Sequence, residues 1–494
     1  MQATWLDRAL GYLAPHVQLR RLRARTAYAM LARHYEAAAT GRRTQNWYRT
    51  TTDANAAIGP SLTYLRNAAR DLVRNNGYAE AGLNAIVDHT IGWGIRASAK
   101  HEAWKRWTES TEIDAEGRLD LAGLQKLVTR TMAESGEVLI RRRWRRPEDH
   151  LTIPIQLQVL EPDFLDTARD TASLPNGGKI VQGVEFDAIG RRAAYWLYSS
   201  HPGSTVSVTS MTFSGASTRI DAKDVLHVFD TKRPGQVRGP SWFAPVLLRF
   251  KDFDEYEDAT LMKQKIAACL AVITSDVDGS AQPLGTADDT ESPAVDSLEP
   301  GMIMNVPPGR DIHVVQPPSA TDYDPYTKNL LRAIATGLGV GYEDLTGDFS
   351  QTNFSSARMA RLRRWERVYH TRWIVLVPQF LNPLWRWAME AMEIAGQPVI
   401  ATTEWTAPPM PMIEPDKEGL AIQRNIRNAI TTPSEEIRAR GYNVTDFLDE
   451  LQADFEEFDR RGLILDCDPR KMTQAGQLQG TGAIAERTAP AGDT

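Results

Sequence analysis

Five short β-type runs between residues 136 and 230 constrain the fold most. They are rich in β-branched and aromatic residues, and Pro, Gly and Asn separate them, as between strands. The chain on either side follows helical spacing instead. Strands gathered in one part of a largely helical chain predict an α+β fold. The five runs are EVLIRRRW, IPIQLQVLEPDFL, IVQGVEF, RAAYWLY and VLHVF.

Helical spacing and capping residues predict the other elements. Asp324-Pro325 starts one helix, with Asp as the cap, and Ser355 or Ser356 caps a long helix that reaches about Ala395. A small strand pair, MIMNV with DIHVV, is expected around Pro307-Pro308-Gly309. Further helices are predicted over 61–75, 78–90, about 25 residues ending at Ala271, 417–430 and 434–440.

The charge and cysteine content exclude several protein classes. A net charge of −6 argues against a protein that coats DNA, although Arg20 to Arg49 form a basic arm. Two cysteines cannot make a disulfide framework or a zinc site by themselves. No apolar run approaches the ~20 residues of a membrane span, and a secretory signal is absent, so we expect a protein made and used in the cytoplasm.

No enzyme motif stands out. The chain lacks a phosphate-binding G-x-x-x-x-G-K-[ST] loop and a G-x-S-x-G nucleophile turn, and His227 is expected to be a buried, satisfied imidazole. The pairs Asp322/Asp324 and Asp466/Asp468 could hold two metal ions, but Asp324 is already explained as a helix cap. We therefore predict no catalytic residues, metal or cofactor, and keep a metal nuclease or a terminase-like enzyme as the alternative.

The stretch GDFSQTNFSSARMARLRRW (347–365) joins a small polar loop to an arginine-rich helix. Arg358, Arg361 and Arg364 recur at helical spacing, and Trp365, Tyr369 and Trp373 form an aromatic stripe on another face. Such a helix could bind DNA. We favour a structural helix packed by its aromatic stripe, with arginines paired to acids of neighbouring elements or subunits, because the chain is net acidic.

Several separate stretches, in this order, resemble the lambda-type phage portal proteins over nearly the full length. They are RDLVRNNGYAEAGLNAIVDHTIGWGI (70–95), LQVLEPDFLD (157–166), GVEFDAIGRRAAYWLY (183–198), DVLHVFDTKRPGQVRGPSWFAPVL (224–247), SSARMARLRRW (355–365) and a long run that begins IEPDKEGLAIQRNIRNAI (413–430).

The resemblance implies a non-enzymatic ring, a dodecamer in assembled heads, at one vertex of a capsid. A terminase pumps double-stranded DNA through the ring, and head-completion (adaptor) proteins dock on it later. The major capsid protein and a scaffold are further implied partners; no membrane or cofactor is implied. The ring would be assembled in the host cytoplasm and would reside in the virion. The basic arm could contact capsid, scaffold or packaged DNA.

The resemblance also divides the chain into parts. They are a basic helical arm (1–60), a wing (61–240), a first stem helix (241–272), a clip (273–320), a second stem helix (321–345), a tunnel loop (346–356), a long wing helix (357–400), a crown (401–475) and a disordered tail (476–494).

A channel that lets any duplex slide cannot grip phosphates, so its wall should be weakly repelling. The tunnel loop has one acid and no base, and the first stem helix carries five acids that could line the channel. We expect the arginines to face neighbouring protein, so that reversing Arg361 and Arg364 to Glu would disrupt the ring. The loop residues are Thr346, Gly347, Asp348, Phe349, Ser350, Gln351, Thr352, Asn353, Phe354 and Ser355; the stem acids are Asp252, Asp254, Glu255, Glu257 and Asp258; the candidates for contact between subunits are Arg358, Arg361, Arg364 and Trp365.

Overall fold

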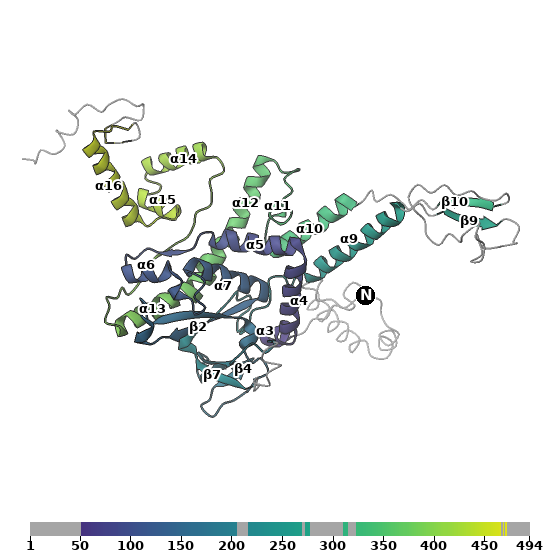
Figure 1. Ribbon diagram of the computed structural model, residues 1–494, viewed down its shortest axis with the longest axis horizontal. Helices are drawn as coiled ribbons and strands as arrows, with labels where there is room; N and C mark the ends of the chain where they lie inside the picture. The colour runs from purple at the N-terminus through teal and green to yellow at the C-terminus, as the bar shows by residue number, and fades with distance from the viewer. Residues whose placement is uncertain are drawn as a thin grey trace, which may run out of the picture. The chain divides into compact units, whose positions relative to one another are not determined.

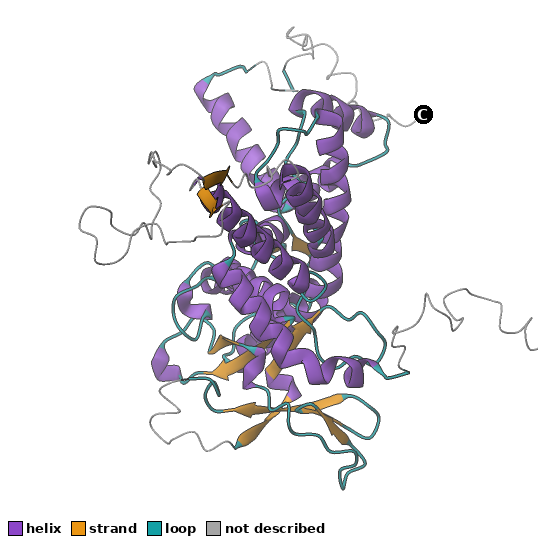
Figure 2. Cartoon of the chain, turned by 90° about the vertical axis from the view of Figure 1, so that its right-hand side faces the viewer, coloured by secondary structure: helices purple, strands orange, loops and turns teal. Residues whose placement is uncertain are grey.

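The computed structural model describes residues 51–204, 216–268, 272–276, 310–314, 323–465, 468, 470 and 471 (Figures 1 and 2). The chain divides into two units, Met1–Asp53 and Ala54–Thr494, and the description below concerns the second. Residues 1–50 of the predicted arm, most of the predicted clip and the predicted tail lie outside the described residues.

Two antiparallel sheets form the β-rich part, in the region where the sequence predicted it. One has the strand order β3-β2-β8, and the other has the order β4-β5-β6-β7. Strand β7 was not predicted, because this polar strand lacks buried residues and so leaves no apolar alternation in the sequence. The bounds are β2 (Glu137–Trp144), β3 (Ile155–Leu160), β4 (Lys179–Val181), β5 (Val184–Phe186), β6 (Arg192–Tyr198), β7 (Ser217–Asp221) and β8 (Val225–Phe229).

Strand β2 joins the two hydrophobic cores. Successive side chains of a strand point to opposite faces. Val138 and Ile140 therefore enter the large core beneath the helices, whereas Leu139 enters a smaller core with Val184 and Tyr195 of the second sheet. Since both faces of β2 are covered, its first four residues are all buried. The mixture of helices and sheets confirms the predicted α+β class.

Helices cover the first sheet and extend away from it (Figures 1 and 2). Asn76 separates two of them: it ends α4 and then caps α5, its side chain accepting a hydrogen bond from the Ala79 amide at 3.0 Å. The helices are α3 (Ala54–Ile58), α4 (Leu62–Asn75), α5 (Gly77–Ile91), α6 (Glu102–Thr108), α7 (Leu121–Ser135), α9 (Leu247–Ala268), α10 (Tyr323–Leu338), α11 (Tyr342–Thr346), α12 (Phe354–Tyr369), α13 (Asn382–Ile394), α14 (Pro415–Arg427), α15 (Pro433–Ala439) and α16 (Val444–Arg461).

Helices α9 and α10 lie side by side (Figure 1). Aromatic rings join them, with the Tyr256 and Tyr326 centroids 4.4 Å apart, and Phe253 of α9 meets Tyr78 of α5 edge to face at 5.5 Å. These contacts are the offset and edge-on arrangements that aromatic pairs prefer. The two helices are therefore fixed both to each other and to the helical layer.

Several predicted boundaries were wrong. The helix expected over 241–272 begins at Leu247, because 242–246 form turns, and the helix expected over 321–345 ends at Leu338, before the separate short helix α11. The long helix continues from α12 through a π-helical segment η7 (His370–Leu381), which contains Pro378, into α13. Proline removes a helical hydrogen bond, and π-helical turns accommodate such a disruption.

One strand of the predicted pair near Pro307 is present. The run DIHVV corresponds to β10 (Arg310–Val314), which pairs with β9 (Val272–Asp276), a strand that the sequence did not predict. Residues 302–306, the expected partner, lie outside the described residues. The remaining strands, β1 (Arg96–Ala97) and β11 (Trp405–Thr406), form a short antiparallel pair.

Candidate functional site

A buried carboxylate fixes the loop that leads into α9. Glu137 stands at the start of β2 and is fully buried, and the Arg238 guanidinium donates to it through Nε at 2.9 and 3.0 Å and through Nη2 at 2.5 Å. The backbone amide of Gly239 adds a hydrogen bond at 3.0 Å. Because residues 238 and 239 belong to the loop before α9, this carboxylate anchors that loop to β2.

Two further side chains complete the cluster around Glu137. Arg66 of α4 approaches it at 3.3 Å, and His227 of β8 lies 2.9 Å away through Nε2. Arg192 contacts the other ring nitrogen, Nδ1, at 2.8 Å. An arginine can only donate, so Nδ1 accepts, and the proton of a neutral His227 is on Nε2, directed at Glu137. The prediction that His227 is buried and satisfied is confirmed.

The electrostatics of this cluster follow from its burial. Burial alone would raise the pKa of Glu137, but Arg238 and the hydrogen bond from His227 outweigh it and hold that pKa far below its ordinary value. Burial lowers the pKa of His227 to about 4, against the opposing influence of Glu137. At neutral pH the cluster therefore holds an ionised carboxylate, a neutral imidazole and charged arginines.

Gly136 makes this geometry possible. Its φ of 93° lies in the left-handed region, and a Cβ there would sit 2.3 Å from the backbone carbon of Pro240. Only glycine allows the strand and the 238–240 loop to come this close. Sequence reasoning missed Glu137, Arg238 and Arg66. The available signal was a lone acid directly before three apolar residues at the start of a strand, a position where a buried carboxylate needs a partner.

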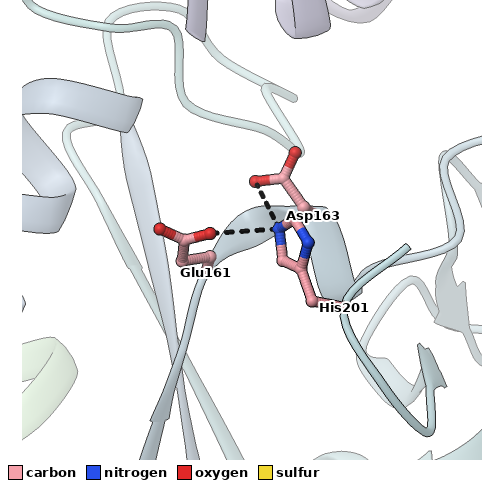
Figure 3. Close-up of side chains that lie close together, drawn as sticks. All are labelled: Glu161, Asp163 and His201. Atoms are coloured by element: carbon pink, nitrogen blue, oxygen red, sulfur yellow. Dashed lines mark ion pairs between the residues drawn. The ribbon is translucent and has the colours of Figure 1, made fainter. Parts of the chain in front are cut away.

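A second acidic group lies beside this cluster. Glu161 and Asp163 face His201, whose Nε2 is 3.1 Å from the first carboxylate and 4.0 Å from the second (Figure 3). Their oxygens and a ring nitrogen are close enough to share a cation. Arg70 already reaches Asp163 at 2.7 Å, and Arg66 reaches it at 3.1 Å, so guanidinium groups supply the positive charge. The arrangement fits an ion-pair network that joins α4 to the first sheet.

The acid pairs singled out from the sequence have ordinary partners where they are described. Asp324 is not a cap but a first-turn residue of α10, paired with Lys328 at 2.9 Å. Asp468 pairs with Arg470 at 2.9 Å. Asp322 and Asp466 lie outside the described residues.

The polar loop is shorter than predicted and is anchored at both ends. Thr346 is the last residue of α11 and Phe354 the first of α12, which leaves Gly347–Asn353 as loop. Gly347, at a φ of 69°, ends α11 in the left-handed conformation that glycine adopts without strain. Asn353, not Ser355 or Ser356, caps α12 by accepting from the Ser356 amide at 2.8 Å.

Hydrogen bonds hold the loop interior, and one aromatic side chain projects from it. The Asp348 carboxylate accepts from the Ser350 amide at 2.9 Å and from the Tyr342 hydroxyl at 3.2 Å, and these bonds lower the pKa of Asp348. Phe349 is 65% exposed. The loop thus presents an aromatic ring and small polar groups, with no cation of its own.

The five acids of α9 divide into two sets. Asp254 and Glu257 are half-buried and engaged within the subunit: Asn76 donates to Asp254 at 2.6 Å, and the Tyr323 hydroxyl donates to Glu257 at 3.1 Å. Burial raises the pKa of Asp254. The other three, Asp252, Glu255 and Asp258, are exposed.

The exposed face of α9 is mixed in charge. Arg249, Lys251 and Lys265 are exposed as well, and Lys251 lies 3.6 Å from Glu255. Lys251 pairs with Glu255, so Asp252 and Asp258 are the exposed acids of α9 that have no ion pair in the described part of the chain. A uniformly acidic helix face is therefore not present, and the channel role of these residues stays a prediction.

Two of the arginines predicted to pair with acids of neighbouring elements or subunits have acidic partners within their own subunit. Arg364 binds Asp344. Burial by itself would raise the pKa of Asp344, but His89 and Arg364 lower it. Arg358 lies 3.7 Å from Glu414, and Arg361 is half-buried. Arg372 is buried and donates to three backbone carbonyls, of Thr90, Pro408 and His89, at 2.6, 2.7 and 2.9 Å. Burial lowers the pKa of Arg372 to about 10.

The predicted aromatic stripe divides in the same way. Trp365 is buried inside the subunit, so it is not a surface for another copy, whereas Tyr369 and Trp373 are 48% and 37% exposed. On the exposed face of α12, Met359 and Leu362 are 68% and 47% exposed, next to Arg363. Sequence reasoning missed this apolar face because arginines surround it in the sequence.

Among the described residues, we find no helix with the length and apolar character that crossing a membrane requires.

Comparisons with known proteins agree on one family. Residues 40–372 match the model described as "Phage portal protein, lambda family". The chain is 26% identical over 448 residues to the "Probable portal protein" of Halomonas phage phiHAP-1, covering 83% of each chain. It is 24% identical over 396 residues to "Portal protein B" of Escherichia phage lambda, covering 71% of this chain and 73% of the relative. A solved structure titled "Virion of native gene transfer agent (GTA) particle" is similar at 15% identity and a TM-score of 0.47, over 76% of this chain and 92% of that one.

Proposed function

Because this chain belongs to the lambda family of phage portal proteins, we propose that its stem helices, polar loop and long helix together build a DNA conduit. The observation that supports this proposal is the family match over 40–372, which spans the stem helices, the polar loop and α12, the first part of the long helix. As a portal protein, the chain is a structural component of a phage particle and not an enzyme. The nuclease or terminase-like alternative is set aside on this ground.

The conduit is a closed ring of identical subunits, most simply a dodecamer, at one vertex of the capsid. The first stem helix is α9, the second is α10, the tunnel loop is Gly347–Asn353 and the long wing helix is α12 with η7 and α13. The wing contains α4 to β8, the clip contains β9 and β10, and the crown contains α14 to α16.

Partners and location follow from the same proposal. A terminase large subunit docks on the ring during packaging, and a head-completion (adaptor) protein docks afterwards. The major capsid protein and a scaffold surround the ring, double-stranded DNA passes through it without sequence preference, and assembly takes place in the host cytoplasm.

Contacts within the subunit support a wall that does not grip DNA. Two described cations close to the loop make contacts within the subunit: Arg364 binds Asp344, and Arg332 donates to Gln351 of the loop at 3.3 Å. The loop itself adds one carboxylate and no base. Each phosphate neutralised by a cation adds salt-dependent affinity, and a ring repeats the same cation in every subunit, so the number of phosphate contacts would rise.

The test of this function is direct imaging. Negative-stain microscopy of the purified full chain should show rings with a central opening. A chain that stays monomeric both alone and when co-expressed with its own capsid and scaffold proteins would contradict the proposal.

Lysines placed in the loop are expected to make the channel adhesive. In Ser350→Lys with Gln351→Lys, rings should bind duplex DNA more tightly, with a salt dependence steeper by about 0.9 in log–log slope for each phosphate contacted. Duplex titrations at several salt concentrations measure this. The matched control is Ser350→Thr with Gln351→Asn, which should bind as the wild type does. Equal affinity and slope for the lysine variant would mean that the loop does not reach DNA.

A further inference from the structure

The crown helices form a unit without a closed core. None of the described residues of α14, α15 and α16 is buried, although all three helices are amphipathic. Phe447, Leu451, Phe455 and Phe458 recur at helical spacing on α16 and are only half-buried. Helices of this length are marginal by themselves and depend on packing of their apolar faces. The crown therefore lacks the burial that such helices normally need.

Apolar side chains on the outside of the crown show where further burial is available. Leu420 of α14 is 51% exposed, Ile430 after it is 70% exposed, and Leu448 of α16 is 47% exposed. Completing the burial of a leucine or isoleucine side chain contributes on the order of 1 to 3 kcal/mol. A partner that covered these residues would stabilise the crown appreciably.

Several crown charges are paired within the subunit. Glu457 pairs with Arg460 and Arg461 at 2.5 Å, and Lys100 pairs with Asp446 and Asp449 at 2.9 and 2.6 Å. These pairs involve residues near the two ends of α16. The acidic residues in the middle of the helix have no ion-pair partner among the described residues.

Among the exposed crown charges without an ion pair in the described residues, two sets of opposite sign lie on different helices. On α14, Arg424 and Arg427 are exposed and share one face with Leu420, at positions i, i+4 and i+7. On α16, Glu450 and Asp454 are exposed and lie one turn apart. The basic face and the acidic face belong to different helices, so one copy can offer the first while the next copy offers the second.

We propose that the Leu420/Arg424/Arg427 face of one subunit binds the Glu450/Asp454 face of the next subunit around the ring. This is a head-to-tail contact, in which two different surfaces of identical chains meet, and such contacts generate closed rings. It rests on the proposed function, because it requires a ring. The occupant is a second copy of this chain, since that copy carries the complementary charge at matching helical spacing. Leu420 would be covered by the same contact.

Charge reversal on either face tests the contact. Arg424→Glu with Arg427→Glu, and separately Glu450→Arg with Asp454→Arg, should each raise the subunit concentration needed for half-maximal ring formation by at least about tenfold. The combined four-residue exchange restores opposite charges and should return that concentration to within about threefold of the wild-type value. Light scattering after gel filtration measures the ring fraction, and circular dichroism checks that each variant is folded.

The matched control reverses two other crown arginines. Arg438 and Arg440 of the α15 region are exposed and unpaired in the described part of the chain, but lie outside the proposed face. Arg438→Glu with Arg440→Glu should leave ring formation unchanged. If the wild type forms rings and neither reversal weakens them, or if the exchange fails to restore them, the crown contact is wrong and the portal function stands. If the wild type forms no rings either alone or when co-expressed with its own capsid and scaffold proteins, both fail.

Discussion

Glu137→Gln is expected to lower the free energy of unfolding by about 3 to 5 kcal/mol, the range for breaking a buried ion pair. Arg238 and Arg66 are almost fully buried, and the substitution leaves them without the carboxylate that compensates their charge. The loop before α9 would lose its anchor, so the stem helix should also become less ordered. Chemical denaturation followed by circular dichroism measures the loss.

Two comparisons separate this effect from a general sensitivity to substitution. Glu148→Gln changes an exposed acid of the same region and should shift the unfolding free energy by less than about 0.5 kcal/mol. Removing both charges in Glu137→Gln with Arg238→Met should cost less than the sum of the two single variants, because fewer buried charges stay unpaired. Strict additivity would contradict the ion-pair explanation.

The pH dependence provides a second measurement on the same cluster. His227 has an ordinary pKa of 6.5 and a folded-state pKa of about 4, so the unfolded chain binds its proton more readily. The contribution of neutral His227 to the free energy of unfolding is therefore fully present above about pH 6.5 and is lost as the pH falls toward 4. In Glu137→Gln, the dependence of the unfolding free energy on pH over this range should differ from that of the wild type. An identical pH profile for both proteins would show that His227 does not titrate with the cluster.

Met359→Glu with Leu362→Glu is expected to abolish ring formation while leaving the subunit folded. These side chains are 68% and 47% exposed in the single subunit, so a charge there costs the subunit little. In a ring that buries this face of α12, every interface would have to bury two unpaired carboxylates. Gel filtration with light scattering should find monomers whose melting temperature is close to that of the wild type.

The matched control places glutamates at two other exposed apolar residues. Ile189 and Ile394 are 72% and 68% exposed, and Ile189→Glu with Ile394→Glu should still form rings. Reversal of Arg361 and Arg364, the test that the sequence pattern suggested, is less selective, because Arg364 already binds Asp344 in its own subunit. Intact rings for Met359→Glu with Leu362→Glu would exclude this face from the interface.

How far the sequence predicted the site depends on the kind of information each residue needs. The loop and the helix after it were located because small polar residues and helical spacing are local signals. Which side chains of that helix are covered was not predicted. Arg358, Arg361 and Arg364 recur on one face in the sequence, but Arg364 binds Asp344 inside the subunit, whereas Arg358 is exposed, as are Met359 and Leu362. Helical spacing shows which residues share a face of the helix, but it does not show which face the rest of the protein covers.

By itself the sequence determined the α+β class, the β-rich segment, the family resemblance and the absence of enzyme motifs, because each is written in local patterns or in the order of short stretches. Only the tertiary structure brought Glu137, Arg66, His227 and Arg238 into one buried cluster, since they come from α4, β2, β8 and a loop. It also divided the α9 acids into engaged and exposed sets. Burial depends on what packs against a residue from distant parts of the chain, and no local pattern carries that information.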